Sequence, residues 1–208
     1  MKRIASLFAL APALTFVACS VPSTPSEDKQ IAEPAEPIAT EATGELQTID
    51  VGLAVGATAP LDATFQTDDG EKTLAAVLED GPAVFIFTRS VEWCPFCQTQ
   101  LKAVNAVVGD LKERGYNLYG VSYDSVASQD RFSKNQMLDY AILSDEGSKA
   151  IDAFDIRDPQ YTEGKAVGVP YASVIVVDQE GTITAKSVSG DFKKRPTNDQ
   201  LLAIVDAI

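Results

Sequence analysis

Two cysteines separated by two residues are the part of this sequence best suited to chemistry. Cys94 and Cys97 lie in the stretch WCPFC, residues 93–97, directly after an apolar run. A C-x-x-C pair at the start of a helix is typical of redox proteins, because the helix N-terminus stabilises a thiolate. We therefore predict that Cys94 has a lowered pKa and attacks, and that Cys97 resolves the mixed disulfide.

Other uses of the cysteine pair are weaker. A zinc site needs about four ligands, but the chain has no histidine and only one further cysteine, Cys19. A purely structural C-x-x-C disulfide closes a very short loop and stabilises a fold little. The absence of histidine also excludes a Ser-His-Asp hydrolase. The sequence favours redox chemistry and predicts no metal and no other cofactor.

The residues around the pair predict a strand, a turn and a helix. Ala83 to Phe87 is a continuous apolar run after Gly81-Pro82, which favours a buried strand. Beyond Cys94, apolar residues spaced by four and three positions predict a helix with one inward face. This stripe consists of Cys97, Leu101, Val104, Val108 and Leu111. Pro95 suits the first helical turn, where its missing N–H costs little.

Residues 51–208 are predicted to form a single α/β domain. Further strands are expected at 117–121, 141–143, 172–177 and 182–188, after a hairpin around residues 65–70. Further helices are expected at 73–78, 125–135, 146–154 and 197–208. Strands that alternate with helices and then end in a hairpin and a helix predict a mixed sheet flanked by helices. The early hairpin is an N-terminal extension of that sheet.

Residues 1–18 are predicted to be a signal peptide. Lys2 and Arg3 precede an apolar stretch, residues 4–18, that is short for a membrane span. The ending FVACS, residues 16–20, resembles the lipobox of bacterial lipoproteins, which implies lipidation at Cys19. The alternative is an ordinary signal peptide with an incidental cysteine.

Residues 19–50 are predicted to be a lipidated tether and an acidic linker. The stretch contains Pro22, Pro25, Pro34 and Pro37, seven acidic residues against one lysine, and no aromatic residue. Such a segment buries too little apolar surface to fold, although an ordered arm packed on the domain is the alternative. We expect the domain to be tethered to a membrane in the bacterial cell envelope and to face the periplasm. Ser20 slightly favours the outer membrane.

The charge balance is acidic, with a formal net charge of −13. Nucleic-acid binding requires a basic surface, so this class of partner is disfavoured. The short basic stretch 193–195, Lys-Lys-Arg, is not long enough to change this expectation.

Four motifs across residues 52–208 resemble the thioredoxin superfamily, in its peroxiredoxin-like branch, the AhpC/TSA or redoxin group. They are GATAP at 56–60, the segment from Phe87 through WCPFC to Leu101, LSDE at 143–146 and VIVVDQEG at 174–181. The resemblance implies a thioredoxin-like fold, with Cys94 as the attacking and Cys97 as the resolving cysteine. It also implies a proline opposite the pair, for which Val169-Pro170 is the candidate.

Four residues are candidates for substrate contact. Pro95 and Phe96 stand between the cysteines and tune the thiolate. Trp93 is expected to shield it as an aromatic wall, with a purely structural position in the core as the alternative. We expect Pro170 to be cis and to present a backbone edge to substrate. The alternative is a trans proline that begins an edge strand.

The chain departs from the peroxiredoxin pattern at three positions. Counted from Cys94, Phe87 and Val91 stand where that pattern has proline and threonine, and Ala172 stands where it has arginine. Arg89 and Arg157 are expected to be solvated or paired surface charges rather than substitutes. The departures favour disulfide chemistry over peroxide chemistry.

Three functions follow. The favoured one is an exported, membrane-tethered thiol-disulfide oxidoreductase that uses Cys94 and Cys97, acts on protein disulfides and is recycled by a membrane electron-donor protein. The second is a thiol peroxidase that reduces hydroperoxides at Cys94. The third is a non-enzymatic redox sensor whose disulfide switches a partner surface.

Overall fold

The computed structural model describes residues 47–208. The predicted signal peptide, Cys19 and the linker up to residue 46 lie outside the described residues, so those predictions stay untested. Within the described part of the chain, no helix has the length and apolar character needed to cross a membrane.

The described residues form a mixed sheet of seven strands in the order β2-β1-β5-β4-β3-β6-β7. The strands are β1 (Thr64–Thr67), β2 (Gly70–Thr73), β3 (Ala83–Phe87), β4 (Asn117–Ser122), β5 (Ala141–Ser144), β6 (Ala172–Val177) and β7 (Ile183–Ser189). Strand β3 pairs in parallel with β4 and antiparallel with β6. The predicted buried strand, mixed sheet and N-terminal hairpin are therefore confirmed.

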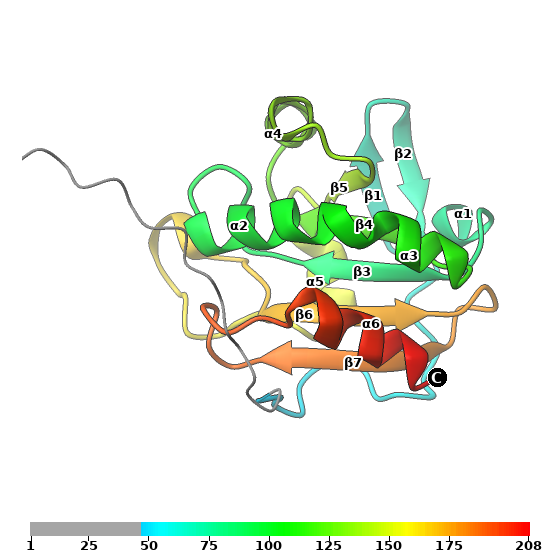
Figure 1. The fold of residues 1–208 in the computed structure, drawn as a ribbon. Coiled ribbons are helices and arrows are strands. Elements are labelled where there is room, and N and C mark those ends of the chain that lie inside the picture. Colours follow the sequence, from blue (N-terminus) through cyan, green and yellow to red (C-terminus); the bar gives the residue numbers. More distant parts are fainter. Residues whose placement is uncertain (1–46) are drawn as a thin grey trace, which may run out of the picture. The chain divides into compact units, whose positions relative to one another are not determined.

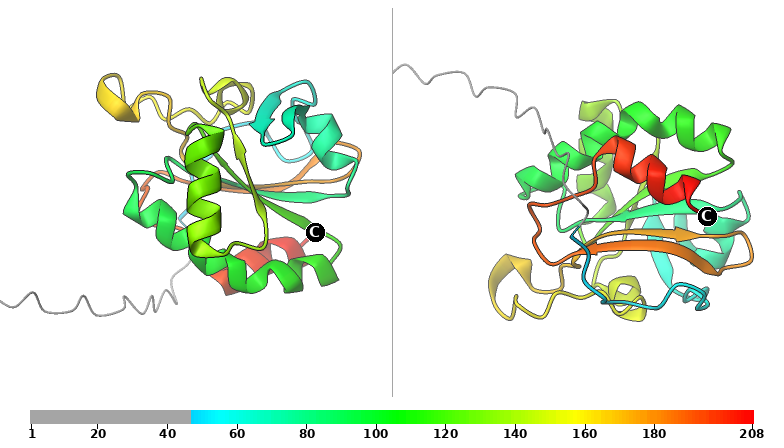
Figure 2. Two further views of the ribbon diagram at one scale, coloured as in Figure 1. Left: turned by 90° about the horizontal axis from the view of Figure 1, so that it is seen from above. Right: turned by 60° about the horizontal axis from the view of Figure 1, so that its bottom comes forward.

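Helices cover both faces of this sheet (Figures 1 and 2). They are α1 (Leu74–Leu78), α2 (Pro95–Val104), α3 (Val108–Glu113), α4 (Val126–Gln136), α5 (Lys149–Ala153) and α6 (Asn198–Asp206), with short 3₁₀ turns η1 (Asn105–Val107) and η2 (Gly164–Ala166). Because side chains alternate along a strand, β3 contributes to two cores. Phe85 and Phe87 pack with residues of α1 and α5, whereas Val84 and Ile86 pack with residues of α2, α3 and α6.

The predicted helix after the cysteines is interrupted. Its apolar stripe is buried as expected, but a 3₁₀ turn at Asn105–Val107 separates α2 from α3. The Asn105 amide makes hydrogen bonds with Asp139, so this side chain ties the interruption to the segment before β5.

The helix predicted at 146–154 begins later, at Lys149. The carboxylate of Asp145 accepts the backbone N–H groups of Ala150 and Ile151 at 3.0 and 2.7 Å. Ser148 adopts a left-handed conformation with φ of 61° and precedes the first helical residue. A carboxylate that accepts the first amide donors of a helix fixes where that helix begins.

Candidate active site

Cys94 and Cys97 form a disulfide at the start of α2, with Cα atoms 5.2 Å apart. Cys94 is the N-cap residue and Pro95 occupies the first turn, as the sequence predicts. The backbone N–H of Cys97 donates to the sulfur of Cys94 at 3.3 Å. Both cysteines are buried, with Cys94 2 % and Cys97 0 % exposed. The Cys94 sulfur thus lies where the helix N-terminus provides a hydrogen-bond donor and partial positive charge.

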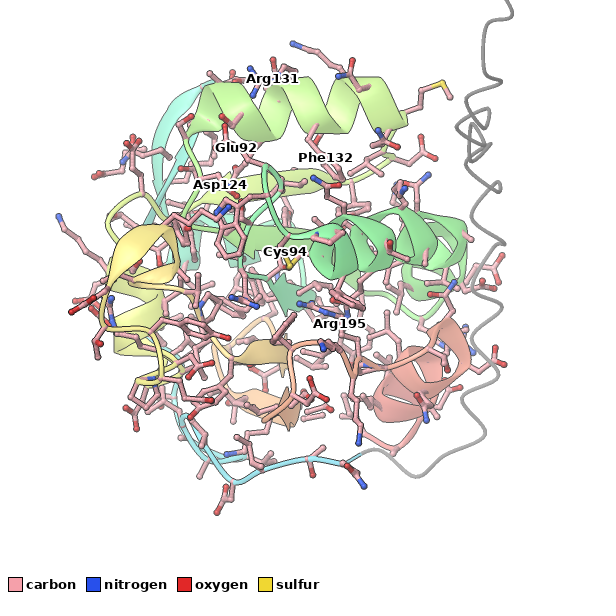
Figure 3. All side chains as sticks on the ribbon, turned by 90° about the vertical axis from the view of Figure 1, so that its left-hand side faces the viewer. Glu92, Cys94, Asp124, Arg131, Phe132 and Arg195 are labelled. Atoms are coloured by element: carbon pink, nitrogen blue, oxygen red, sulfur yellow. A yellow bond between two sulfur atoms is a disulfide. The ribbon has the colours of Figure 1, made fainter. Side chains whose placement is uncertain are left out.

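A carboxylate holds the loop that joins β3 to the cysteines. Asp124, just beyond the end of β4, accepts the Ser90 hydroxyl and the Val91 N–H, both at 2.7 Å. The Ser90 hydroxyl in turn accepts the N–H groups of Glu92 and Trp93. Burial raises the pKa of Asp124, and its hydrogen bonds oppose that rise. Figure 3 shows Asp124 and Glu92 on one side of Cys94 and Arg195 on the other.

The half-buried ring of Trp93 lies among polar and charged partners. Its indole N–H donates to the Tyr123 hydroxyl at 3.0 Å, and Lys165 lies 5.0 Å from the ring centroid. Phe96 is 38 % exposed and meets the ring of Phe192 edge-on, with centroids 5.7 Å apart. Trp93 and Phe96 therefore place aromatic side chains near the cysteine pair, and their contact with substrate remains a prediction.

The expectation for Pro170 is wrong. The described residues contain no cis peptide bond, so the Val169–Pro170 bond is trans. Pro170 forms a β-bridge with Arg157, flanked by hydrogen bonds from Asp158 N–H to Val169 and from Tyr171 N–H to Ile156. Extended backbone in an antiparallel bridge accommodates trans proline at a position where no N–H is needed. The trans bond agrees with the alternative, but the strand that follows Pro170, β6, lies between β3 and β7 and is not an edge strand.

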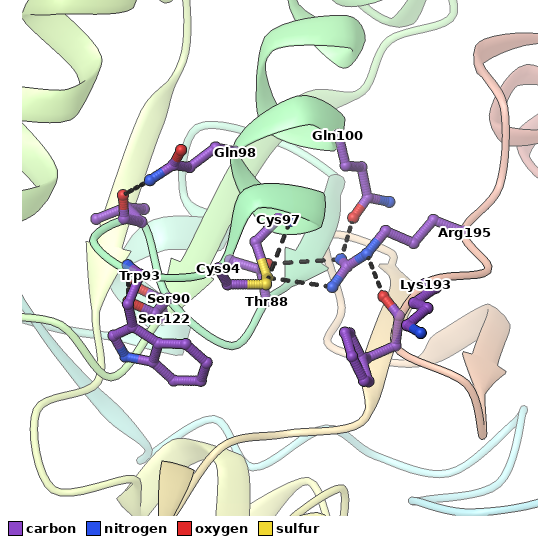
Figure 4. The surroundings of a disulfide bond; sticks show 12 residues. Thr88, Ser90, Trp93, Cys94, Cys97, Gln98, Gln100, Ser122, Lys193 and Arg195 are labelled. Carbon is purple, nitrogen blue, oxygen red and sulfur yellow. Dashed lines mark hydrogen bonds between the residues drawn. A yellow bond between two sulfur atoms is a disulfide. The ribbon is translucent and has the colours of Figure 1, made fainter. Parts of the chain in front are cut away.

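Arg195 is the site residue that sequence reasoning missed. It comes from the loop between β7 and α6, and its Nη2 donates to the Cys97 sulfur at 3.2 Å (Figure 4). Its other hydrogen bonds reach the Gln100 side chain, the Thr88 hydroxyl at 3.5 Å and the Phe192 carbonyl at 2.9 Å. Burial of the guanidinium, together with nearby Arg89, lowers the pKa of Arg195 to about 10, so it remains a cation at neutral pH.

The expectation that Arg89 is a surface charge is also wrong. This side chain is only 6 % exposed, and its guanidinium lies 5.0, 4.5 and 4.2 Å from the ring centroids of Trp93, Tyr161 and Phe192. Among the described residues its Nε has no hydrogen-bond partner. Aromatic faces attract a guanidinium, which explains how three rings take the place of an acidic partner. By contrast, Arg157 pairs with Asp152, as expected for a surface charge.

The two arginines place positive charge near the disulfide, and neither has an ion-pair partner among residues 47–208. Arg89 lowers the pKa of Arg195, which shows that the two charges repel each other. Buried charges normally find partners, so the two guanidiniums make this site favourable for an anion. The sequence gave a signal for Arg89 alone, since it lies two residues after the strand that precedes the cysteines. The contact between Arg195 and Cys97 spans 98 positions, and no local pattern indicates it.

Within residues 47–208, no group of three or more His, Cys, Asp or Glu side chains is arranged to hold a metal ion. The site that the described residues build is a buried cysteine pair with arginine and aromatic neighbours. A cysteine pair that begins the helix after an inner strand of a mixed sheet defines a thioredoxin-like redox protein.

Comparison with known proteins specifies the family. The model described as the AhpC/TSA family matches residues 55–186, and the chain belongs to this family. Peroxiredoxin Bcp of Escherichia coli K12 is 25 % identical over 134 residues, which cover 64 % of this chain and 84 % of that protein. The chloroplastic peroxiredoxin Q of Populus jackii is 32 % identical over 151 residues, 72 % of this chain and 67 % of the relative.

A solved structure supports the same assignment. Peroxiredoxin Q of Xanthomonas campestris superposes with a TM-score of 0.62 and 26 % identity, and the match covers 76 % of this chain and 98 % of that one. The predicted resemblance to the peroxiredoxin-like branch of the thioredoxin superfamily is therefore confirmed.

Proposed function

We propose that this protein is a thiol peroxidase that reduces hydroperoxides with the Cys94/Cys97 pair. The observation that carries the proposal is the disulfide at the start of α2 with the Arg195 guanidinium on one of its sulfurs. Membership of the AhpC/TSA family and similarity to peroxiredoxins support peroxide as the substrate. The proposal reverses the order that the sequence motifs favoured, which placed disulfide exchange before peroxide reduction.

The reaction begins from the reduced pair. The Cys94 thiolate attacks one oxygen of the hydroperoxide, the O–O bond breaks, and the other oxygen takes a proton and leaves as an alcohol or water. Cys94 is then a sulfenic acid. The Cys97 sulfur attacks it, water leaves, and the disulfide forms. A dithiol reductant returns two electrons and two protons to the pair and completes the cycle.

The helix N-terminus and Arg195 assist different sulfurs. The N–H of Cys97 points at the Cys94 sulfur, where it stabilises the attacking thiolate. Arg195 contacts the Cys97 sulfur and stabilises its thiolate for the resolving step. Both thiolates form only on reduction, and they then place negative charge next to these donors.

Thr88 provides a hydroxyl group at the site. Phe87 and Val91, which stand at the proline and threonine positions of the peroxiredoxin pattern, provide none. Thr88 is fully buried, and its hydroxyl accepts from Arg195 at 3.5 Å. Figure 4 shows Thr88 beside the disulfide. A hydroxyl and a guanidinium that are held together can both donate to hydroperoxide oxygens, so we assign to Thr88 and Arg195 the positioning of the O–O bond.

Thiol-disulfide exchange is the second candidate function. The observation that favours it is the N-cap position of Cys94, because the first cysteine of a helix-starting C-x-x-C pair is a general nucleophile for disulfides. We also retain as proposals a lipid anchor at Cys19, a periplasm-facing position in the cell envelope and a membrane electron-donor protein. The amino-terminal sequence alone supports the anchor and the location.

A trapping experiment tests the peroxidase. The Cys97→Ser variant is reduced, mixed with one equivalent of hydrogen peroxide, and treated with a reagent that adds only to sulfenic acids. We expect mass spectrometry to locate the adduct on Cys94, and the Cys94→Ser variant to give none. If neither variant forms an adduct on a cysteine while both remain folded, the peroxidase proposal is wrong.

A further inference from the structure

Arg195 places a cation directly on the disulfide. Its Nη2 donates to the Cys97 sulfur at 3.2 Å, and its other hydrogen bonds go to the Gln100 side chain, the Thr88 hydroxyl and the Phe192 carbonyl. All of these acceptors are neutral groups, and no ion pair involves Arg195 among residues 47–208. The guanidinium therefore presents an uncompensated positive charge to the sulfur.

Two further cations lie at the ring of Trp93, the residue before Cys94. The guanidinium carbon of Arg89 and the Nζ of Lys165 are each 5.0 Å from the ring centroid. The Tyr123 hydroxyl accepts the indole N–H of Trp93 and donates to the carbonyl of Lys165, so it holds the η2 turn against the ring. Neither cation is part of an ion pair within the described part of the chain.

A fourth cation, Lys193, lies near the residues between the cysteines. Its Nζ is 5.7 Å from the ring centroid of Phe192, and that ring contacts Phe96 edge-on. Figure 4 shows Lys193 on the same side of the disulfide as Arg195. We call Arg89, Lys165, Lys193 and Arg195 the cationic cluster.

The nearby carboxylates do not neutralise this cluster. Glu92 accepts a hydrogen bond from Arg131 on α4 at 3.4 Å, and Asp124 is buried in its own hydrogen bonds. The loops 161–167 and 190–196, which carry three of the four cations, contain one carboxylate each, Glu163 and Asp191. The cations therefore remain in excess around the disulfide.

This positive charge acts on the step that reduces the disulfide. A thiolate, RS⁻, attacks the Cys94 sulfur, the S–S bond breaks, and Cys97 leaves as a thiolate next to Arg195. A second RS⁻ attacks the mixed disulfide, RSSR leaves, Cys94 becomes a thiolate, and the pair has gained two electrons. The cluster attracts a thiol that carries a further negative charge, although the whole protein, with a net charge of −13, repels it.

We propose that the reductant of the Cys94–Cys97 disulfide is an anionic thiol, with a carboxylate close to its sulfur, and that the cationic cluster selects it. A small carboxylate-bearing thiol and an acidic cysteine-containing segment of a protein share this chemistry. The selectivity rests on the proposed function only in that the pair must cycle between disulfide and dithiol. It does not depend on peroxide as the oxidant.

Three small thiols of similar size measure the selectivity. Oxidised protein is mixed with excess 3-mercaptopropionate, which is anionic, neutral 2-mercaptoethanol or cationic cysteamine, at neutral pH and low ionic strength. No peroxide is present, so a failed peroxidase would not alter the result. Reduction is followed by alkylation and mass spectrometry, and each rate is divided by the rate of the same thiol with the neutral disulfide of 2-mercaptoethanol. This division removes differences in thiol reactivity.

We expect the corrected rate to be about tenfold higher for the anionic thiol than for the cationic thiol. The ratio should fall towards one in about 1 M salt, where the Debye length is about 3 Å. Equal corrected rates at low ionic strength, including no reduction by any of the three thiols, would overturn the proposal. So would a higher corrected rate for cysteamine, which the net charge alone favours.

Exposed lysines test the cluster without disturbing the core. A unit charge about 10 Å away in water changes the two rates by about twofold in opposite directions, so Lys165→Gln should lower their ratio by about fourfold. Lys193→Gln should lower it similarly. Lys112→Gln makes the same charge change on exposed α3, beyond the far end of α2 (Figure 1), and should leave the ratio unchanged. Equal effects of Lys112→Gln and Lys165→Gln would show general charge attraction and contradict the assignment.

A pair of peptides with blocked termini distinguishes the two sources of an anionic thiol. Reduction by Asp-Cys-Asp is compared with reduction by Gly-Cys-Gly, with the same correction for thiol reactivity. A gain for both 3-mercaptopropionate and the acidic peptide supports an acidic protein donor, whereas a gain for 3-mercaptopropionate alone supports a small thiol. A gain for neither would show that the cationic cluster does not select the reductant.

Discussion

At the residue scale, the two sulfurs of the cysteine pair have different neighbours. The Cys94 sulfur accepts the N–H of Cys97, and the Cys97 sulfur accepts a guanidinium N–H of Arg195. Both donors stabilise negative charge, which the disulfide lacks and the reduced pair has. Arg195 therefore favours the reduced form of the pair and makes the disulfide a stronger oxidant.

Replacing Arg195 should make the disulfide harder to reduce. In Arg195→Gln, loss of one charge-assisted hydrogen bond of about 1.4 kcal/mol lowers the midpoint potential by about 30 mV. A titration against a glutathione redox buffer measures the shift. Arg114→Gln, which removes a surface arginine paired with Asp206, is the matched control and should not change the potential. A higher potential in Arg195→Gln would show that Arg195 stabilises the oxidised pair instead.

The sequence predicted the cysteine pair but not its charged surroundings. Cys94 and Cys97 are recognisable because their spacing and the apolar stripe lie within one short segment. The contact between Arg195 and Cys97 depends on how the loop before α6 packs against α2. The local sequence pattern does not indicate this packing. The trans geometry of Pro170 likewise depends on its pairing with Arg157, a partner 13 residues away in the chain.

At the element scale, Asp124 joins the end of β4 to the loop before α2. It accepts hydrogen bonds from Ser90, Val91 and Ser122, so the loop that places Cys94 is anchored to the sheet. Most strands and helices were predictable, because each has its own periodicity. In the structure Thr73, Ser125 and Thr197 cap the starts of α1, α4 and α6. The break between α2 and α3 was not predicted, and neither was the late start of α5, which depends on the Asp145 side chain.

The pH dependence of stability tests the environment of Asp124. Burial raises its folded pKa above the unfolded value. Its contribution to stability is therefore full below the unfolded pKa and is lost as the pH rises through the folded pKa. Relative to Asp124→Asn, the free energy of unfolding of the wild type should increase as the pH is lowered from about 7 to about 4.

Urea denaturation at several pH values measures this difference, with the ionic strength held constant. The Asn side chain keeps the shape of Asp but does not titrate, so the difference between the two proteins isolates this carboxyl and its coupling to Glu92. A difference that shrinks as the pH falls would mean that the charged carboxylate is the form that the fold prefers.

At the scale of the whole molecule, the chain combines a redox domain with an acidic N-terminal stretch. The net charge of −13 contrasts with the two arginines beside the disulfide. Composition predicted the acidic character, whereas the concentration of positive charge at one site follows from the fold. The proposed tether, residues 19–50, would keep such a domain near a membrane and near an electron donor there.

Substitution of Cys19 tests the tether. In a bacterial host that processes lipoproteins, the full chain should fractionate with membranes and Cys19→Ala should become soluble, because the acyl anchor is lost. Peroxide reduction by the full chain should not change in Cys19→Ala, since Cys19 is not part of the cysteine pair. Equal membrane recovery of both proteins in cell fractionation would contradict lipidation at Cys19.

The most direct test of the account is the rate at which reduced protein consumes hydrogen peroxide at neutral pH. Stopped-flow traces are compared for residues 47–208 of the wild type, Cys94→Ser and Cys97→Ser. We predict that the wild type and Cys97→Ser react at least about a hundredfold faster than a free thiol, and that Cys94→Ser does not. A wild type that reacts no faster than a free thiol would contradict the peroxidase and leave disulfide exchange as the function of the pair.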